Sequence, residues 1–210
     1  SRARCAAWTG DEGFELIANA ANLGLAAALN QGFAAAARAG AEWVVTFDQD
    51  STPPPGFVAA LEAERDSLPA VGTVGLVAPV YRDQRLGFVY SADRRLDRDP
   101  RPRVEVTVAM MSGNLVRLAA ARDAGGFRED FFIDCVDQEF CLRLRRRGWR
   151  IVETANCVLE HRQGAWTQRR LFGLRPRFND YPAFRRYYQM RNRLVLYARH
   201  FLAEPRWIAR

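Results

Sequence analysis

The stretch Trp-Val-Val-Thr-Phe-Asp-Gln-Asp, residues 43–50, decides the fold class of this chain. Its apolar run is typical of a buried strand, and it stops at two carboxylates, Asp48 and Asp50. The alanine-rich segment 25–39 before it has helical composition, and another apolar run, 14–18, precedes that segment. A strand, a helix and a strand joined in this way normally give parallel strands buried between helices. The pattern therefore predicts an α/β fold with an open, mostly parallel sheet flanked by helices.

The rest of the chain continues this alternation. Hydroxyl and proline residues at 51–55 predict the start of a helix, and glycines at 125–126 and at 148 predict the ends of two more. The segments predicted as helices are 57–65, 115–124 and 136–147. The segments predicted as strands are 74–81, 104–111, 149–153 and 157–160.

Charge is distributed unevenly along the 210 residues. The formal net charge is +7, and every basic residue is an arginine. Residues 162–210 carry 12 arginines against Asp180 and Glu204, a local charge of +10, so residues 1–161 carry −3. We therefore divide the chain into an α/β domain, residues 1–161, and a basic, aromatic, helical extension, residues 162–210.

Cysteine and hydropathy patterns indicate the compartment. The chain has four cysteines, Cys5, Cys135, Cys141 and Cys157. They form no CxxC pair and have no zinc-finger spacing, and their neighbours are apolar. This pattern is typical of small buried residues and fits a reducing compartment best. The uncharged stretch 16–37 contains several amides and glycines and is too polar for a membrane span. No signal peptide is evident, so we expect a cytoplasmic protein.

Asp48 and Asp50 are the first candidate site. Ligands of open α/β sheets bind beyond the carboxyl ends of the strands, and a strand period of two places both side chains on one side, about 7 Å apart by Cα. Two carboxylates so placed suit a divalent cation that also holds a diphosphate. The alternative is that Asp50 and Ser51 only cap the following helix.

A second acidic cluster, residues 134–139, begins the amphipathic helix. Asp134 as an N-cap with acids in the first turn is what a helix dipole favours, and that interpretation needs no ligand. A carboxylate held there could instead accept a proton from a hydroxyl, which makes Asp137 a candidate general base. His161 ends a predicted strand; a lone histidine is more often structural, but this one could complete a metal site with Asp50.

Seven short stretches follow one another along nearly the whole chain, and as an ordered set they are specific: NLGLA at 22–26 with NQG at 30–32, FDQDS at 47–51, MSGNL at 111–115, GGF at 125–127, FIDCVDQEF at 132–140, HRQG at 161–164 and YYQMRN at 187–192. In this order they resemble the inverting family 2 glycosyltransferases of the GT-A fold, especially their bacterial rhamnosyltransferase branch. The family usually begins with a strand that is missing before residue 14, so we expect a chain truncated at its N-terminus.

The resemblance implies a role for each matching residue. It places Asp48 towards the nucleotide ribose, Asp50 on a Mg²⁺ or Mn²⁺ ion, His161 as a further ligand of the metal or diphosphate, and Asp137 as the catalytic base. Residues expected to border the nucleotide are Asn22, Gly24 and Asn30. Those expected to floor the sugar pocket are Ser112, Gly113 and Asn114, and those expected near the diphosphate or acceptor are Arg191 and Asn192.

The function that the resemblance implies is metal-dependent, inverting transfer of a sugar from a nucleoside-diphosphate donor to a saccharide or polyprenyl-linked acceptor in cell-surface polysaccharide synthesis. The family suggests dTDP-rhamnose as the donor; the residues themselves do not dictate it. An inactive GT-A scaffold is one alternative.

The basic extension leaves a choice of partners open. It could lie on an anionic leaflet at the inner face of the bacterial plasma membrane, or pack on the α/β domain with its arginines solvated. Arginines interleaved with aromatic residues also occur in single-strand nucleic-acid binders, but the acidic α/β domain would repel phosphate, so we expect no nucleic-acid partner.

Overall fold

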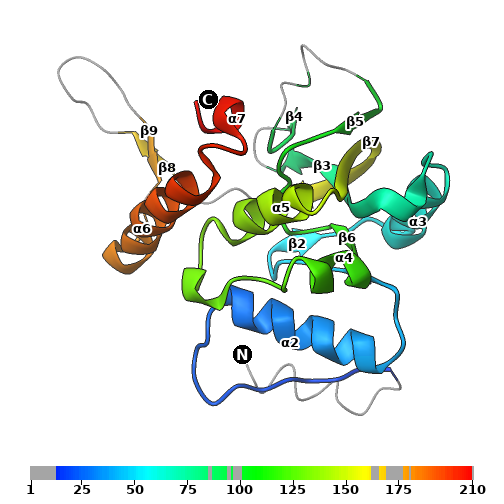
Figure 1. Ribbon diagram of the computed structural model, residues 1–210, viewed down its shortest axis with the longest axis horizontal. Coiled ribbons are helices and arrows are strands. Elements are labelled where there is room, and N and C mark those ends of the chain that lie inside the picture. The colour runs from blue at the N-terminus through cyan, green and yellow to red at the C-terminus, as the bar shows by residue number, and fades with distance from the viewer. Residues whose placement is uncertain are drawn as a thin grey trace.

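The computed structural model describes residues 13–84, 87–93, 96, 101–161, 166–168, 177–179 and 181–209 (Figure 1). The strands of the main sheet in this part of the chain are β1 Trp43–Val45, β2 Ser51–Thr52, β3 Val74–Asp83, β4 Val89–Tyr90, β5 Arg103–Glu105, β6 Leu115–Arg117 and β7 Arg150–His161. A separate two-stranded sheet pairs β8 Trp166–Gln168 with β9 Arg177–Asn179. The helices in the same ranges are α2 Leu25–Arg38, α3 Phe57–Asp66, α4 Leu118–Asp123, α5 Val136–Arg146, α6 Ala183–His200 and α7 Pro205–Ile208, with short 3₁₀ turns at Val71–Thr73 and Glu129–Phe131.

The main sheet has the strand order β1-β6-β3-β7-β2, with β4 on β3 and β5 on β7. Only β3 and β7 pair in parallel among the described strands, and the other pairs are antiparallel. The α/β class with an open sheet is therefore confirmed, but the sheet is mixed rather than mostly parallel. Parallel pairing needs a long crossover, usually a helix, and short connections such as the one from β3 to β4 instead reverse the chain.

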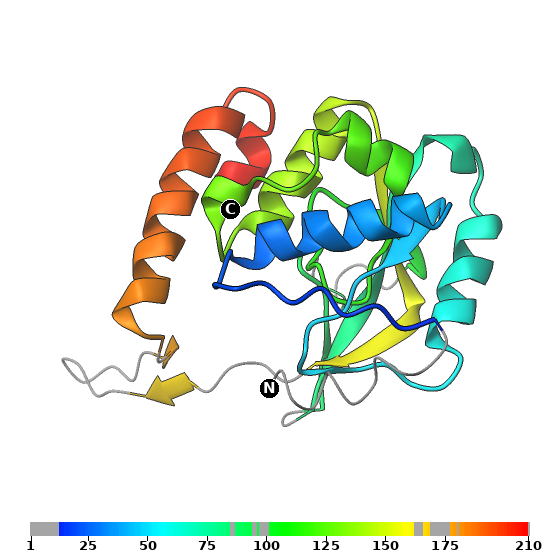
Figure 2. The ribbon, with the colours of Figure 1, turned by 90° about the horizontal axis from the view of Figure 1, so that it is seen from below.

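The apolar run 14–18 forms no strand, contrary to the sequence prediction. Its side chains at Phe14, Leu16 and Ile17 are exposed, and the segment runs beside α2 (Figures 1 and 2). Asn19 and Gln31 exchange side-chain hydrogen bonds of 2.8 and 3.0 Å, which hold this segment to the helix. An apolar run becomes a strand only where a neighbouring strand pairs with it, and the pairing of β1 among the described residues is with β6.

Three other segments differ from the prediction. Residues 115–117 form β6 before α4 begins, residues 106–111 are buried but irregular, and 150–161 is one strand rather than two. Ser51 and Thr52 form β2, whereas α3 begins after Gly56. The interpretation of Asp50 and Ser51 as a helix cap is therefore wrong.

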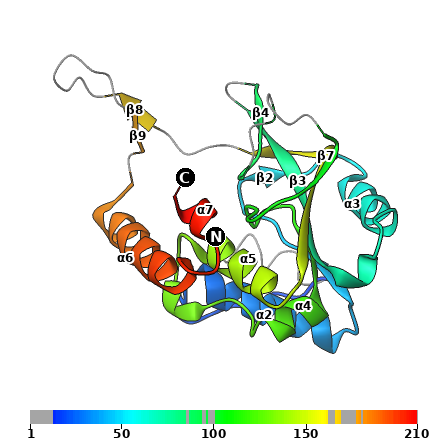
Figure 3. The ribbon, with the colours of Figure 1, turned by 45° about the horizontal axis from the view of Figure 1, so that its top comes forward.

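Two apolar clusters cover the two faces of the sheet. Helices α2, α4 and α5 pack on one face and α3 on the other, as Figure 3 shows. Strand β3 lies between them and is buried along nearly its whole length. The free cysteines Cys135, Cys141 and Cys157 are buried, as expected, while Cys5 lies outside the described residues.

Helix α6 lies at the edge of the molecule in Figures 1 and 2, and one of its faces packs on the α/β domain through the buried residues Asn192, Leu196 and His200. The domain division at residue 161 stays a prediction, since residues 162–165 lie outside the described ranges. Within those ranges, every helix is too short or too polar to traverse a lipid bilayer.

Candidate functional site

One cleft of about 640 Å³ opens between the carboxyl ends of the sheet strands, the start of α5 and the inner side of α6. Charged and polar side chains from four separate segments line it. These are Asp48 and Asp50 after β1, Asp137 in α5, His161 at the end of β7, and Arg185, Gln189 and Arg193 on α6. The sequence therefore folds so that Asp48, Asp50, Asp137 and His161 share one cavity, as expected from their positions.

The backbone around Asp48 is hydrogen-bonded to the turn at 111–114. The Thr46 hydroxyl donates to the Met111 carbonyl at 2.6 Å, and the Asp48 N–H donates to the Ser112 hydroxyl at 3.0 Å. The Ser112 hydroxyl also lies 2.6 Å from that of Ser51. Ser112 thus fixes the 48–51 loop and leaves the two carboxylates free to face the cleft.

His161 reaches the cleft because β2 and β7 pair. Ser51 lies opposite His161 in the antiparallel register, which brings the imidazole beside the residue after Asp50. The ring packs edge-on to Tyr81, with centroids 6.3 Å apart. Its Nδ1 is buried without a hydrogen-bond partner. A buried ring nitrogen normally finds a partner, so this one is available to a ligand.

A metal ion at this site would have few protein ligands. The described residues contain no group of three or more His, Cys, Asp or Glu side chains arranged to hold a metal. Asp50 and His161 supply one carboxylate and one unpartnered imidazole nitrogen. The Asp50 carboxylate fits an ion whose other ligands are phosphate oxygens and water, which is how Mg²⁺ is usually bound, and the imidazole would be a further ligand.

Asp137 lies in the first turn of α5, after a run of backbone in unusual conformations. Phe132, Asp134 and Cys135 all have positive φ values, of 58°, 63° and 58°. The Asp137 carboxylate accepts the Gln138 N–H at 2.8 Å. Burial raises the pKa of Asp137 to about 6. The group is therefore ionised at neutral pH, yet it is a better proton acceptor than an ordinary aspartate.

The charges in the cleft also act on Asp48. Burial raises its pKa, and the neighbouring Asp50 raises it further, while His161 and Arg185 act in the opposite direction. The two carboxylates repel each other, and a bound cation would relieve that repulsion.

Helix α6 holds the loop 131–135, which leads into α5 and Asp137, by hydrogen bonds and an ion pair. The Asn192 side-chain amide donates to the carbonyls of Phe131, Ile133 and Asp134, at 2.7, 2.8 and 2.9 Å. Arg185 forms a two-point ion pair with the Asp134 carboxylate, at 3.0 and 3.1 Å. Asp134 is thus an ion-pair partner and no N-cap, since Cys135 occupies that position without a side-chain cap.

Comparison with known proteins identifies the family of this chain. A family model for Glycosyl transferase family 2 matches residues 2–125, more than half of the chain. The chain belongs to glycosyl transferase family 2. The matched range contains Asp48 and Asp50 and ends before Asp137 and His161.

This family 2 chain is 28% identical over 194 residues to the dTDP-rhamnosyl transferase RfbF of Shigella flexneri, covering 88% of this chain and 63% of that protein. It shares its fold with the mannosyltransferase PcManGT from Pyrobaculum calidifontis, solved in complex with GDP-Man and Mn²⁺, with a TM-score of 0.52 and 20% identity over 76% of this chain and 42% of that one. The chain thus spans less than two thirds of the length of either relative.

Other residues that the resemblance assigned to the family 2 site lie outside the cleft lining. Asn192 is fully buried and saturated by loop carbonyls, and Arg191 donates to the Asp130 carbonyl at 2.5 Å. That these two residues lie near the diphosphate or acceptor stays a prediction, but the contacts that the structure shows are with the loop before α5. They position the loop of the candidate base.

The residues predicted to border the nucleotide also have structural contacts. The Asn22 side-chain oxygen accepts the Gly24 N–H at 3.0 Å in a local turn. Gly24 has a φ of 88°, and a Cβ there would lie 2.7 Å from Phe132. Asn30 exchanges hydrogen bonds of 2.7 and 2.9 Å with the Phe127 backbone. None of the three lines the cleft among the described residues.

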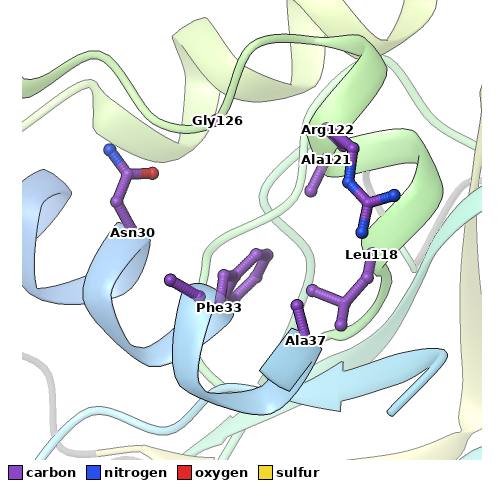
Figure 4. Close-up of a pocket in the computed structure, with 8 residues that line it drawn as sticks. Asn30, Phe33, Ala37, Leu118, Ala121, Arg122 and Gly126 are labelled. Carbon is purple, nitrogen blue, oxygen red and sulfur yellow. The ribbon is translucent and has the colours of Figure 1, made fainter. Parts of the chain in front are cut away.

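Asn30 instead lines a second, smaller pocket of about 180 Å³ between α2 and α4, shown in Figure 4. The labelled side chains in that view are mainly apolar, with Arg122 at one side. The pocket shares no lining residue with the cleft.

The turn at 112–114, which the resemblance places at the floor of the sugar pocket, lies beneath the surface of the cleft. Ser112 and Asn114 are buried, and Gly113 packs against Leu159 and Pro79. The cleft surface above them is formed by Met110 and Met111.

Sequence reasoning missed the cationic and amide side chains of α6. Arg185, Gln189 and Arg193 follow one another at intervals of four residues, which places them on one helix face. That spacing of long polar residues was the available signal, hidden within a tail rich in arginine.

Proposed function

We propose that this chain catalyses transfer of a sugar from a nucleoside-diphosphate donor to an acceptor hydroxyl, with inversion at the anomeric carbon. The observation that supports the proposal most is the convergence of Asp50, His161 and Asp137 in one cleft. Asp50 and His161 lie 111 residues apart in the sequence, and the pairing of β2 with β7 brings their segments together.

Asp50 and His161 would hold a Mg²⁺ or Mn²⁺ ion together with the donor diphosphate. When bound, such an ion supplies positive charge against the diphosphate as it leaves. The unpartnered His161 nitrogen supports this assignment. So does the Mn²⁺ that accompanies GDP-Man in the PcManGT complex.

Asp137 would act as the general base. Its raised pKa, about 6, suits removal of a hydroxyl proton while the new glycosidic bond forms near neutral pH. Asp48 would face the nucleotide ribose. Arg193 would add positive charge beside the diphosphate, whereas the charge of Arg185 is offset by Asp134.

The proposed donor is dTDP-rhamnose, and the proposed acceptor is a saccharide or a polyprenyl-linked saccharide of a cell-surface polysaccharide. The donor is supported by the similarity to a protein named dTDP-rhamnosyl transferase. We place the reaction on the cytoplasmic side of the membrane, and the buried free cysteines support such a reducing compartment.

The direct test is release of nucleoside diphosphate from dTDP-rhamnose, UDP-glucose and GDP-mannose, each with Mn²⁺, Mg²⁺ or chelator and with a panel of saccharide acceptors. Asp137→Asn should lower turnover by at least about 10²-fold while donor binding persists, because general acid–base catalysis typically contributes that much or more. Asp66→Asn is the matched control, an exposed aspartate outside the cleft.

Each outcome has a separate meaning. Unchanged turnover in Asp137→Asn would remove that residue from the role of base. Binding of a nucleoside diphosphate with Mn²⁺, but no turnover with any donor and acceptor, would favour a binding protein on the same scaffold.

A further inference from the structure

Helix α6 has an outer face as well as the inner face that packs on the α/β domain. On the outer face and at Phe201, the residue after the helix, large side chains recur at intervals of three and four residues and are 40–66% exposed: Tyr187, Met190, Leu194, Tyr197 and Phe201. We call this set the outer stripe. It is about 21 Å long at 1.5 Å per residue. Leu202, 92% exposed, extends it at the C-terminal end.

The borders of the outer stripe that belong to α6 itself carry positive charge. Helix α6 contains five arginines and no acidic residue. At about 100° per residue, Arg186 and Arg193 lie along one border of the stripe and Arg191 along the other. An apolar stripe between cationic borders is the pattern of a helix that lies in the interface of an anionic membrane.

A second copy of the chain fits this face poorly. Intervals of three and four residues also occur in coiled coils, where acidic and basic residues flank the seam and pair across it. Two outer stripes placed together would bring arginine borders against arginine borders, with no acid on α6 to pair with them. Like charges placed so oppose association.

One helix, α6, carries the outer stripe and also contributes side chains to the cleft. Arg185, Gln189 and Arg193 of α6 line the cleft, while the outer stripe faces away from the sheet. Figure 1 shows α6 at the edge of the molecule, on the side opposite α3. A bilayer that holds the outer stripe would therefore lie beside the cleft.

We propose that the outer stripe of α6 docks the protein on an anionic lipid leaflet and so presents the cleft to an acceptor carried by a membrane lipid. This inference places the proposed transfer at the membrane surface, and it rests on the proposed function for the identity of the acceptor. The docking of the outer stripe on lipid does not depend on the proposed function. Tyrosine rings at Tyr187 and Tyr197 suit the headgroup level, and Met190, Leu194 and Phe201 suit the region beneath.

The test is co-sedimentation of the protein with vesicles of phosphatidylcholine alone or of phosphatidylcholine with phosphatidylglycerol. We expect at least about tenfold stronger partitioning to the anionic vesicles, and a steep loss at about 0.5 M salt because the added ions screen the attraction. The double variant Leu194→Ser with Tyr197→Ser should lose at least about tenfold in partitioning. Val58→Ser, an apolar residue on α3 that is 42% exposed, is the matched control and should bind as the parent does.

Two further measurements separate the possible results. Both variants should melt at the parent's temperature, since their side chains are exposed, and should turn over a water-soluble acceptor at the parent's rate. Equal vesicle binding by the parent and the double variant would overturn the inference. A dimer in light scattering that the double variant dissociates would overturn it in favour of a second copy. If the parent showed no turnover with a water-soluble acceptor, that result would instead count against the proposed function alone.

Discussion

Replacing Asn192 by alanine removes the amide that clasps the loop in front of α5. Its two N–H groups serve three carbonyls, of Phe131, Ile133 and Asp134, at 2.7 to 2.9 Å, and the side chain is fully buried. Since two hydrogens are shared among three acceptors, the loss corresponds to about two hydrogen bonds. At about 1 to 1.5 kcal/mol each, the expected destabilisation is about 2 to 3 kcal/mol.

The same change should impair turnover more than it impairs donor binding. Phe132, Asp134 and Cys135 have positive φ values, and such conformations persist only where the surroundings hold them. Without the clasp, the loop can relax and move Asp137 relative to the acceptor. A displacement of about 1 Å can cost about 10²-fold in rate.

Urea denaturation followed by circular dichroism gives the stability of the parent, of Asn192→Ala and of Asn192→Asp. The aspartate has the same shape but no amide donor, and its charge would face three carbonyl oxygens, so it should destabilise more than alanine does. If Asn192→Asp were as stable as the parent, or if Asn192→Ala cost less than about 0.5 kcal/mol, hydrogen bonding by this amide would not hold the loop.

Two further predictions concern the base and the buried turn. Turnover should rise about tenfold per pH unit up to about pH 6 and level off above it, because the Asp137 carboxyl is protonated and inactive below its pKa of about 6. Initial rates measured between about pH 4.5 and 8 test this. A flat pH profile would contradict the assignment of Asp137 as the base. Gly113→Ala should destabilise by roughly 2 kcal/mol or more in urea, because φ is 79° and the new Cβ would lie 2.7 Å from Leu159. Gly32→Ala is its control: it lies inside α2 with open space around it, so it should stabilise by up to about 1 kcal/mol, and a similar loss at both positions would refute the packing argument.

Local pattern was enough to predict much of the fold. The helix over 25–39, the helix over 57–65 and the strand over 74–81 follow from composition and caps, and each is present within a few residues. Segment 14–18 could not be predicted this way. Its apolar content is that of a strand, but strand formation depends on a partner, and Asn19 holds the segment to α2 instead.

Topology also predicted which site residues would meet. Asp48 and Asp50 end one strand and His161 ends another, and strand ends on the same edge of a sheet gather at one place. Their roles stay proposals, but their common cleft follows from the chain order.

The roles of the asparagines could not be read from sequence. Asn30 and Asn192 occur in family-like stretches, where an amide can bind either a ligand or a backbone carbonyl. Their partners lie 97 and about 60 residues away along the chain. Only the folded chain shows that both amides hold loops, and only it shows Arg185 entering the cleft from α6.

The central claim is that Asp50 and His161 hold a cation that in turn binds the donor diphosphate. The most direct measurement is calorimetric titration of dTDP into the parent and into Asp50→Ala, with and without Mn²⁺. We predict that Mn²⁺ tightens dTDP binding by at least about tenfold in the parent and leaves it unchanged in Asp50→Ala. An equal gain from Mn²⁺ in both proteins, or no gain in the parent, would contradict the account.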